Sequence, residues 1–141
     1  MISVTVGNVE YEYEDGTTIY EIAKDFKNYY DNDIILAVCN DKLCELSRVL
    51  TDNSKIRFIT TANHVGNECY KRSVAFMMLK AFYKVADKSS FDKISIEYSV
   101  SKGFYCKVIG NIQINKTFLS KLKKEMDALV KWDILITKET V

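Results

Sequence analysis

Hydrophobic and polar residues alternate regularly at the start of the chain. Ile2–Val6 and Val9–Tyr13 each place apolar side chains at every second position, and Gly7-Asn8 separates the two segments. A period of two is typical of half-buried strands, and a two-residue link containing glycine is typical of a tight hairpin. The pattern predicts an N-terminal β-hairpin, after which Asp15-Gly16-Thr17 turns the chain.

The pattern then changes to the period of a helix. Thr18 and Glu21 have the spacing of a capping box, in which each side chain accepts a hydrogen bond from the other residue's backbone amide. The apolar residues that follow are three or four positions apart, so they share one face of a helix: Ile19, Ile22, Ala23 and Phe26. We expect this helix to cover one face of the sheet that contains the hairpin.

Three further strands complete the first region. Ile34–Val38 is a continuous apolar run with β-branched members, as in a central strand, and Asn40-Asp41 turns it toward Lys42–Cys44. Lys55–Ile59 alternates again. The order of two strands, a helix and further strands predicts a β-grasp (ubiquitin-like) domain over residues 1–61.

Residues 62–141 are expected to form a second α+β domain that begins with a long helix, Asn67–Ala86. A hairpin follows, made of Ile94–Val100 and Phe104–Ile109 around the turn Ser101-Lys102-Gly103. The long helix is expected to bury one side, formed by Tyr70, Val74, Met77, Met78, Ala81 and Val85.

The end of the second domain is expected to contain another helix and the start of a strand. Asn115 is placed to cap the helix, and the strand would begin near Ile134. The apolar side of this helix is predicted to hold Leu119, Leu122, Met126, Leu129 and Val130, with Lys121, Lys123, Lys124 and Lys131 mainly exposed.

Composition narrows the class of protein. The 141 residues are 28% charged and 48% hydrophobic, which fits one or two small globular domains. No apolar run approaches the roughly 20 residues that span a bilayer, so we expect a cytoplasmic protein with no membrane partner. Residues 1–61 hold 6 basic and 11 acidic side chains, whereas residues 62–141 hold 14 and 8. The basic region either contacts phosphates or is a solvated lysine-rich surface.

Few residues suggest metal or acid–base chemistry. Cys39 and Cys44 form an isolated C-x4-C pair, which is a weak zinc signal compared with packed free thiols. His64 is the only histidine and is expected in an exposed linker. A turn and a helix cap explain Asp15 and Glu21 better than general acid–base catalysis does. The sequence predicts no catalytic residue, metal site or cofactor in this chain.

The first domain resembles a TGS domain, the ubiquitin-like module of threonyl-tRNA synthetases, certain GTPases and (p)ppGpp synthetase/hydrolases. The resemblance covers residues 1–61 and is carried by Asp15-Gly16-Thr17, Ile34–Val38 with the turn after it, and Ile56–Thr60. It implies a small accessory module without catalytic residues, associated with binding RNA or a ligand or with regulation.

The second domain resembles the editing domain of threonyl- and alanyl-tRNA synthetases. The resemblance rests on the helix around Ser73-Val74-Ala75, on Gly103-Phe104-Tyr105 and on the lysine-rich helix. The family helix carries His-x-x-x-His, which ligates zinc from one helical face. Arg72 and Phe76 stand at those positions, and neither donates a lone pair to a metal. The resemblance therefore implies a scaffold whose hydrolytic zinc site is lost.

A similar pair of domains precedes the P-loop kinase domain of some bacterial uridine kinase-like nucleoside kinases, in which the editing histidines are typically not kept. We expect a noncatalytic accessory region of such a kinase, or alternatively the N-terminal part of an editing-deficient threonyl-tRNA synthetase acting in tRNA recognition. The chain contains no Walker A motif. ATP and Mg²⁺ are therefore expected only for a catalytic domain outside this sequence.

The resemblance also predicts partners and a binding site. The second domain is expected to be truncated at Val141, to adjoin a downstream catalytic domain of the same polypeptide, and to pair as a homodimer through exposed strand edges. A small anionic ligand or RNA would bind near Arg72, Gly103 and Tyr105, with the Arg72 guanidinium holding a phosphate or carboxylate. A surface salt bridge is the alternative role for Arg72.

Overall fold

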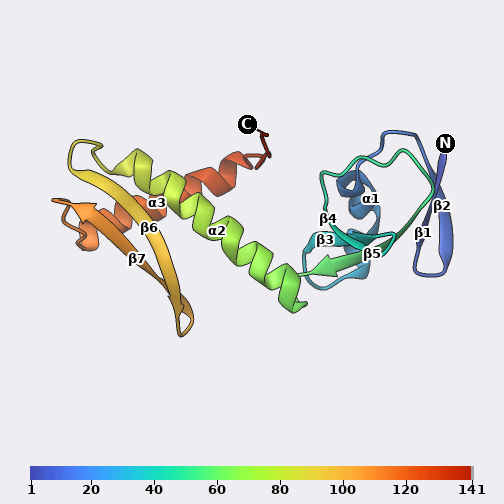
Figure 1. The fold of residues 1–141 in the computed structure, drawn as a ribbon, viewed down its shortest axis with the longest axis horizontal. Coiled ribbons are helices and arrows are strands. Elements are labelled where there is room, and N and C mark those ends of the chain that lie inside the picture. Colours follow the sequence, from blue (N-terminus) through green and yellow to red (C-terminus); the bar gives the residue numbers. More distant parts are fainter. Residues whose placement is uncertain (141) are drawn as a thin grey trace. The chain divides into compact units, whose positions relative to one another are not determined.

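The structure, a computed structural model, describes residues 1–140 and divides into two compact units, Met1–Arg72 and Ser73–Val141 (Figure 1). The division falls within the helix α2, whereas the sequence placed a domain boundary after Thr61, at the end of the last strand of the first unit. That boundary stays a prediction. The strands and helices before α2 are β1 (Ile2–Val6), β2 (Val9–Tyr13), α1 (Ile19–Phe26), η1 (Lys27–Tyr29), β3 (Ile34–Cys39), β4 (Lys42–Glu45) and β5 (Ser54–Thr60).

The first unit contains one mixed five-stranded sheet with the strand order β2-β1-β5-β3-β4. The outer pairs are antiparallel hairpins, and β1 and β5 run parallel at the centre. Asn40 and Asp41 both have positive φ angles, 48° and 65°, which suit a tight turn between β3 and β4. The predicted β-grasp arrangement and the α+β fold class are confirmed.

The helix α1 begins at the predicted capping box. The Glu21 backbone N–H donates to Thr18 Oγ1 over 3.2 Å, and the Thr18 backbone N–H donates to Glu21 Oε2 over 2.8 Å. The hydrogen bonds that the Thr18 backbone N–H and the Thr18 hydroxyl donate to the Glu21 carboxylate lower the pKa of Glu21. All four residues of the predicted apolar stripe are buried, in one core with residues of β1, β3 and β5. The prediction for α1 is therefore confirmed residue by residue.

Tyr13 joins the end of β2 to α1. Its hydroxyl donates to Asp25 Oδ2 over 3.0 Å. Burial, followed by this hydrogen bond and the negative charge of Asp25, raises the pKa of Tyr13 to about 12. The neutral phenol is thus stabilised in the folded state.

In the rest of the chain, α2 (His64–Val85) is followed by the hairpin of β6 (Phe91–Val100) and β7 (Gly103–Gly110) and by α3 (Lys116–Trp132). Asn115 caps α3 as predicted, because its side-chain oxygen accepts from the Phe118 backbone N–H over 2.9 Å. The core of the second unit centres on Phe82, which is 2% exposed and makes edge-to-face contacts with Phe91 and Phe118 at centroid distances of 5.2 and 5.3 Å.

The predicted buried side of α2 is confirmed only in part. Ala81 is buried and Met78 packs against the cluster around Phe82, whereas Tyr70 is 49% exposed and Phe82 itself was not predicted. Apolar residues lie all around α2, so their spacing identified the packed side incompletely. The strand expected near Ile134 is absent within residues 134–140, which pair with neither strand of the two-stranded sheet. No helix within residues 1–140 is long and apolar enough to cross a membrane.

Candidate functional site

The start of α2 is fixed against the end of β5 by a close backbone approach. A Cβ atom at Gly66 would lie 2.2 Å from the Thr60 carbonyl oxygen, so only glycine fits this position. Asn63 caps the helix, because its side-chain oxygen accepts from the Val65 backbone N–H over 2.9 Å. His64, expected in a linker, is exposed as predicted but is the first residue of α2.

Arg72 and Phe76 lie one turn apart on α2, so they share one face of the helix. Both are exposed, and Phe76 is 58% exposed. Among residues 1–140, no acidic side chain forms an ion pair with Arg72. The guanidinium is therefore open to solvent, and the surface salt bridge considered as its alternative role is not found in this part of the chain.

The part of the chain that the structure describes holds no group of three or more His, Cys, Asp and Glu side chains arranged to bind a metal ion. Cys39 is buried in the β-grasp core, and Cys44 lies on the neighbouring strand. Burial is the main cause that raises the pKa of Cys44, whose thiol donates to the Ala37 carbonyl oxygen over 3.4 Å. A protonated thiol is a poor metal ligand. The expected absence of metals and cofactors stays a prediction.

Gly103 and Tyr105 lie at the start of β7, two positions apart on the same face of the hairpin. A Cβ atom at Gly103 would meet only the Val100 carbonyl oxygen, at 3.8 Å, so packing does not require glycine there. The strained residue of the turn is Ser101, with a φ of 54°. Arg72 belongs to the first unit and the two hairpin residues to the second. A groove that joins all three stays a prediction.

Tyr105 has a partner that the sequence did not indicate. Its ring stacks on that of Tyr98, with a centroid distance of 5.1 Å and an interplanar angle of 18°. In the regular register of the hairpin, Ile94 pairs with Val108 and Ile96 with Cys106. An irregularity between Ile96 and Tyr98 shifts the register by one residue and brings Tyr98 opposite Tyr105.

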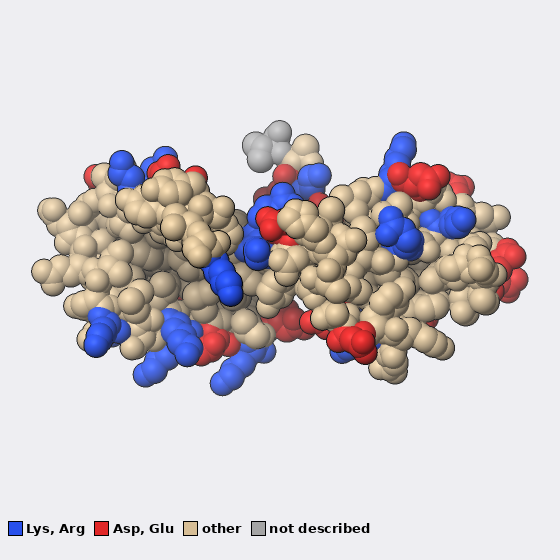
Figure 2. All heavy atoms as spheres, turned by 90° about the horizontal axis from the view of Figure 1, so that it is seen from below, with Lys and Arg blue, Asp and Glu red and all other residues tan. Residues whose placement is uncertain are grey.

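The helix α3 presents lysines on its exposed side and apolar residues on the other. Leu129 is buried, and Leu122 packs against the cluster around Phe82. Lys121, Lys123 and Lys124 are exposed, as predicted. Lys84 Nζ of α2 forms an ion pair with Glu125 Oε1 of α3 over 2.9 Å and lies 5.6 Å from the centroid of the Trp132 ring. Figure 2 shows Lys and Arg side chains along the surface of the second unit, which lies on the left in that view.

Leu119 and Val130 were predicted on the buried side of α3. They are 52% and 62% exposed, so this part of the prediction is wrong. The packed face of α3 instead includes Phe118, whose ring contacts Phe82. The aromatic side chain reaches the core from a position next to the expected stripe.

The chain is similar over nearly its whole length to threonine–tRNA ligases, although no protein-family model matches it. The relative from Thermotoga neapolitana is 29% identical over 133 residues, which are 94% of this chain and 20% of the relative. Those from Carboxydothermus hydrogenoformans and Clostridium botulinum (strain Eklund 17B) are 27% and 26% identical over 98% of this chain, which corresponds to 22% and 21% of their lengths.

These comparisons change the order of the two functional interpretations. Nothing in them or in the structure supports the uridine kinase-like interpretation that the sequence favoured, whereas the threonyl-tRNA synthetase alternative is supported. The chain spans about a fifth of the length of these relatives. The chain is thus similar to a region of threonine–tRNA ligases, and its β-grasp unit is followed by an α+β unit.

Proposed function

We propose that this chain is a noncatalytic tRNA-recognition region of the threonyl-tRNA synthetase type, without a hydrolytic zinc site. The observation that carries the proposal is the similarity to threonine–tRNA ligases, which extends across both units. Because the chain corresponds to about a fifth of these proteins, we infer that it acts beside a catalytic domain of the same polypeptide. ATP and Mg²⁺ would belong to that domain.

The charges of residues 62–141 support contact with RNA. These residues include 14 Lys and Arg against 8 Asp and Glu. Three lysines follow one another closely on α3, and all are exposed: Lys121, Lys123 and Lys124. Lysine binds the phosphates of a nucleic acid by point-charge attraction, without sequence readout. This region would hold the tRNA backbone.

Arg72 is the residue of α2 that we propose to contact an anion. Its guanidinium is exposed, without an ion pair in residues 1–140. Arg72 stands at the position where the editing domain that residues 62–141 resemble would carry a zinc-binding histidine. Arginine pairs with a phosphate through two parallel hydrogen bonds, which lysine cannot reproduce. Arg72→Ala should weaken tRNA binding, and Arg72→Lys should restore only part of the loss.

A binding titration tests the proposal. Fluorescence anisotropy of labelled tRNA would be compared for the wild-type protein and the variant Lys121→Gln/Lys123→Gln/Lys124→Gln. The matched control removes three exposed lysines of the first unit, Lys27→Gln/Lys42→Gln/Lys55→Gln. We expect the α3 variant to bind more weakly and to lower the slope of log K against log salt by about 0.9 for each phosphate that it no longer neutralises. Equal weakening in both variants would contradict a specific role for α3.

A further inference from the structure

One face of the β6–β7 hairpin points away from the core of the second unit. Ile94 is buried and Val108 packs against the cluster around Phe82, so this cross-strand pair faces the core. Successive side chains of a strand alternate between its faces. Tyr105, Lys107 and Ile109 of β7 therefore lie on the opposite face, and Ile109 is 46% exposed.

The same outward face carries residues of β6. Ser95 pairs with Lys107, and Lys93 pairs with Ile109. After the irregularity in β6, Tyr98 pairs with Tyr105 and therefore lies on the same outward face as Lys93 and Ser95. In a continuous register, Tyr98 would have shared the inward face with Ile94 and Ile96. The shift in register thus moves an aromatic ring from the core side to the surface.

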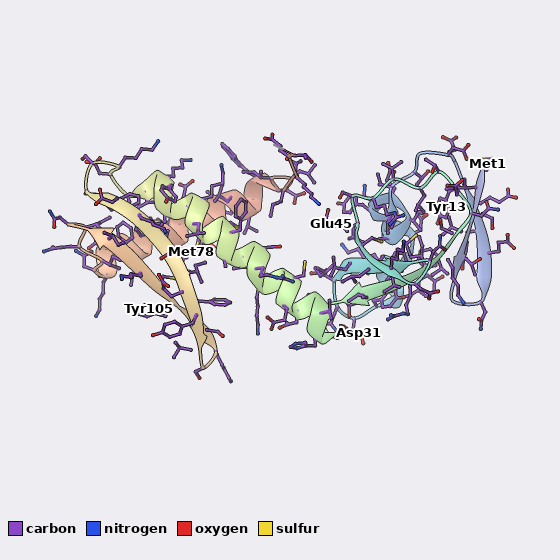
Figure 3. The ribbon with its side chains drawn as sticks, viewed as in Figure 1. Met1, Tyr13, Asp31, Glu45, Met78 and Tyr105 are labelled. Atoms are coloured by element: carbon purple, nitrogen blue, oxygen red, sulfur yellow. The ribbon has the colours of Figure 1, made fainter. Side chains whose placement is uncertain are left out.

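Tyr98 and Tyr105 remain open to solvent although they stack on each other. They are 60% and 45% exposed, and their rings are nearly parallel at 18°. A stacked pair uses one face of each ring and leaves the other available. Gly103, on the same face as Tyr105, adds no side chain beside it. Figure 3 shows Tyr105 on the hairpin.

The charged side chains on this outward face indicate which class of molecule it can bind. Lys107 lies on it two positions from Tyr105, Lys93 lies farther along the same face opposite Ile109, and both lysines are exposed. Glu97 also reaches it, since Ser95 Oγ donates to Glu97 Oε1 over 2.7 Å. Exposed aromatic rings beside lysines are the combination that binds single-stranded nucleic acid, with bases stacked on the rings and phosphates near the cations. A purely apolar partner would leave both lysines without an anion.

We propose that Tyr98 and Tyr105 form a stacking platform for unpaired bases of an RNA strand, with Lys107 and Lys93 next to its phosphates. The inference rests on the proposed tRNA-recognition function and assigns the single-stranded part of the RNA to this face. The exposed lysines of α3 would contact paired regions through phosphates alone. Bases of any identity have a π-face, so the platform would show little sequence preference.

Two RNA probes test the platform: a single-stranded oligocytidylate of about ten nucleotides and a blunt-ended RNA duplex. Tyr98→Ala/Tyr105→Ala should weaken oligocytidylate binding roughly tenfold or more, because each stacked base contributes substantially to affinity. Duplex binding should stay unchanged. Tyr98→Phe/Tyr105→Phe keeps both ring faces and should bind the oligocytidylate like the wild-type protein. Far-UV circular dichroism would verify that each variant is folded.

The outcomes separate the platform from the function on which it rests. Unchanged oligocytidylate affinity in the double-alanine variant would overturn the platform. Binding of tRNA but not of oligocytidylate by the wild-type protein would also overturn it and would leave the proposed function intact. Absence of binding to tRNA and to both probes would overturn both. The wild-type protein could also self-associate without binding RNA. If the double-alanine variant abolished that self-association, this face would be assigned to a second copy of the chain and the platform would be overturned.

Discussion

Arg72 and Phe76 determine what chemistry the exposed face of α2 offers. They lie one turn apart, where two histidines would ligate a metal, and neither has a lone pair suited to that role. A guanidinium and a phenyl ring instead offer an anion contact and an apolar surface. At the scale of single residues, this face is suited to binding rather than to activating water.

Metal analysis tests this interpretation of α2. After incubation with zinc and extensive dialysis, the wild-type protein should retain far less than one zinc ion per chain. Arg72→His/Phe76→His supplies two nitrogen ligands on one helical face and should retain measurably more. One zinc ion held tightly by each wild-type chain would show a metal site that residues 72 and 76 do not explain.

Tyr13 gives a pH-dependent prediction at the same scale. Its pKa is raised to about 12 in the folded state, against an ordinary value of about 10. Its contribution to stability is therefore complete below pH 10 and is lost as the pH rises from about 10 to about 12, because the unfolded chain releases this proton first. Tyr13→Phe should remove this part of the alkaline loss of stability, measured by urea unfolding at each pH. An identical alkaline profile in Tyr13→Phe would show that the titration of Tyr13 does not contribute to the alkaline loss of stability.

Tyr105 and Tyr98 show which residues of a candidate site can be predicted from a sequence. Tyr105 was expected to bind a ligand because it belongs to a Gly-Phe-Tyr segment, and this role stays a prediction. Tyr98, on which it stacks, was not expected there. Its position depends on the register shift after Ile96, and the alternation of β6 continues through that point in the sequence. Where one extra residue in a strand changes the face of a side chain, periodicity alone places that side chain on the wrong side.

Helices α1 and α2 show the same limit at the scale of whole elements. The apolar residues of α1 lie on one side and its capping box marks its start, so the packed face was predicted correctly. Along α2, aromatic and aliphatic residues lie on every side, and Phe82 was not expected at the centre of the core. A strand was likewise expected to begin near Ile134, but a strand forms only where another strand supplies hydrogen bonds.

Two phenylalanines on α2 provide a matched test of its packing. Phe82 is 2% exposed and Phe76 is 58% exposed. Phe82→Ala should lower the free energy of unfolding of the second unit by about 3–5 kcal/mol, because burial is reduced and a cavity remains. Phe76→Ala should change it by about 0.5 kcal/mol or less. Urea unfolding followed by far-UV circular dichroism measures both, and a larger loss for Phe76→Ala would contradict the packing of α2.

For the whole molecule, the distribution of charge and the comparisons support the proposed tRNA-recognition function. The acidic residues predominate in residues 1–61 and the basic residues in residues 62–141. The two units together are similar to a region of threonine–tRNA ligases. We therefore expect the second unit to attract RNA and the first to add little electrostatic affinity. The expected homodimer has no support in these observations and stays a prediction.

The salt dependence of tRNA binding tests this function most directly. The affinity of the wild-type chain for tRNA would be measured by fluorescence anisotropy between about 50 and 200 mM salt. We expect binding at low salt that weakens steeply as salt is added, with a linear plot of log K against log salt whose slope corresponds to several neutralised phosphates. No detectable binding at the lowest salt concentration would contradict the tRNA-recognition function.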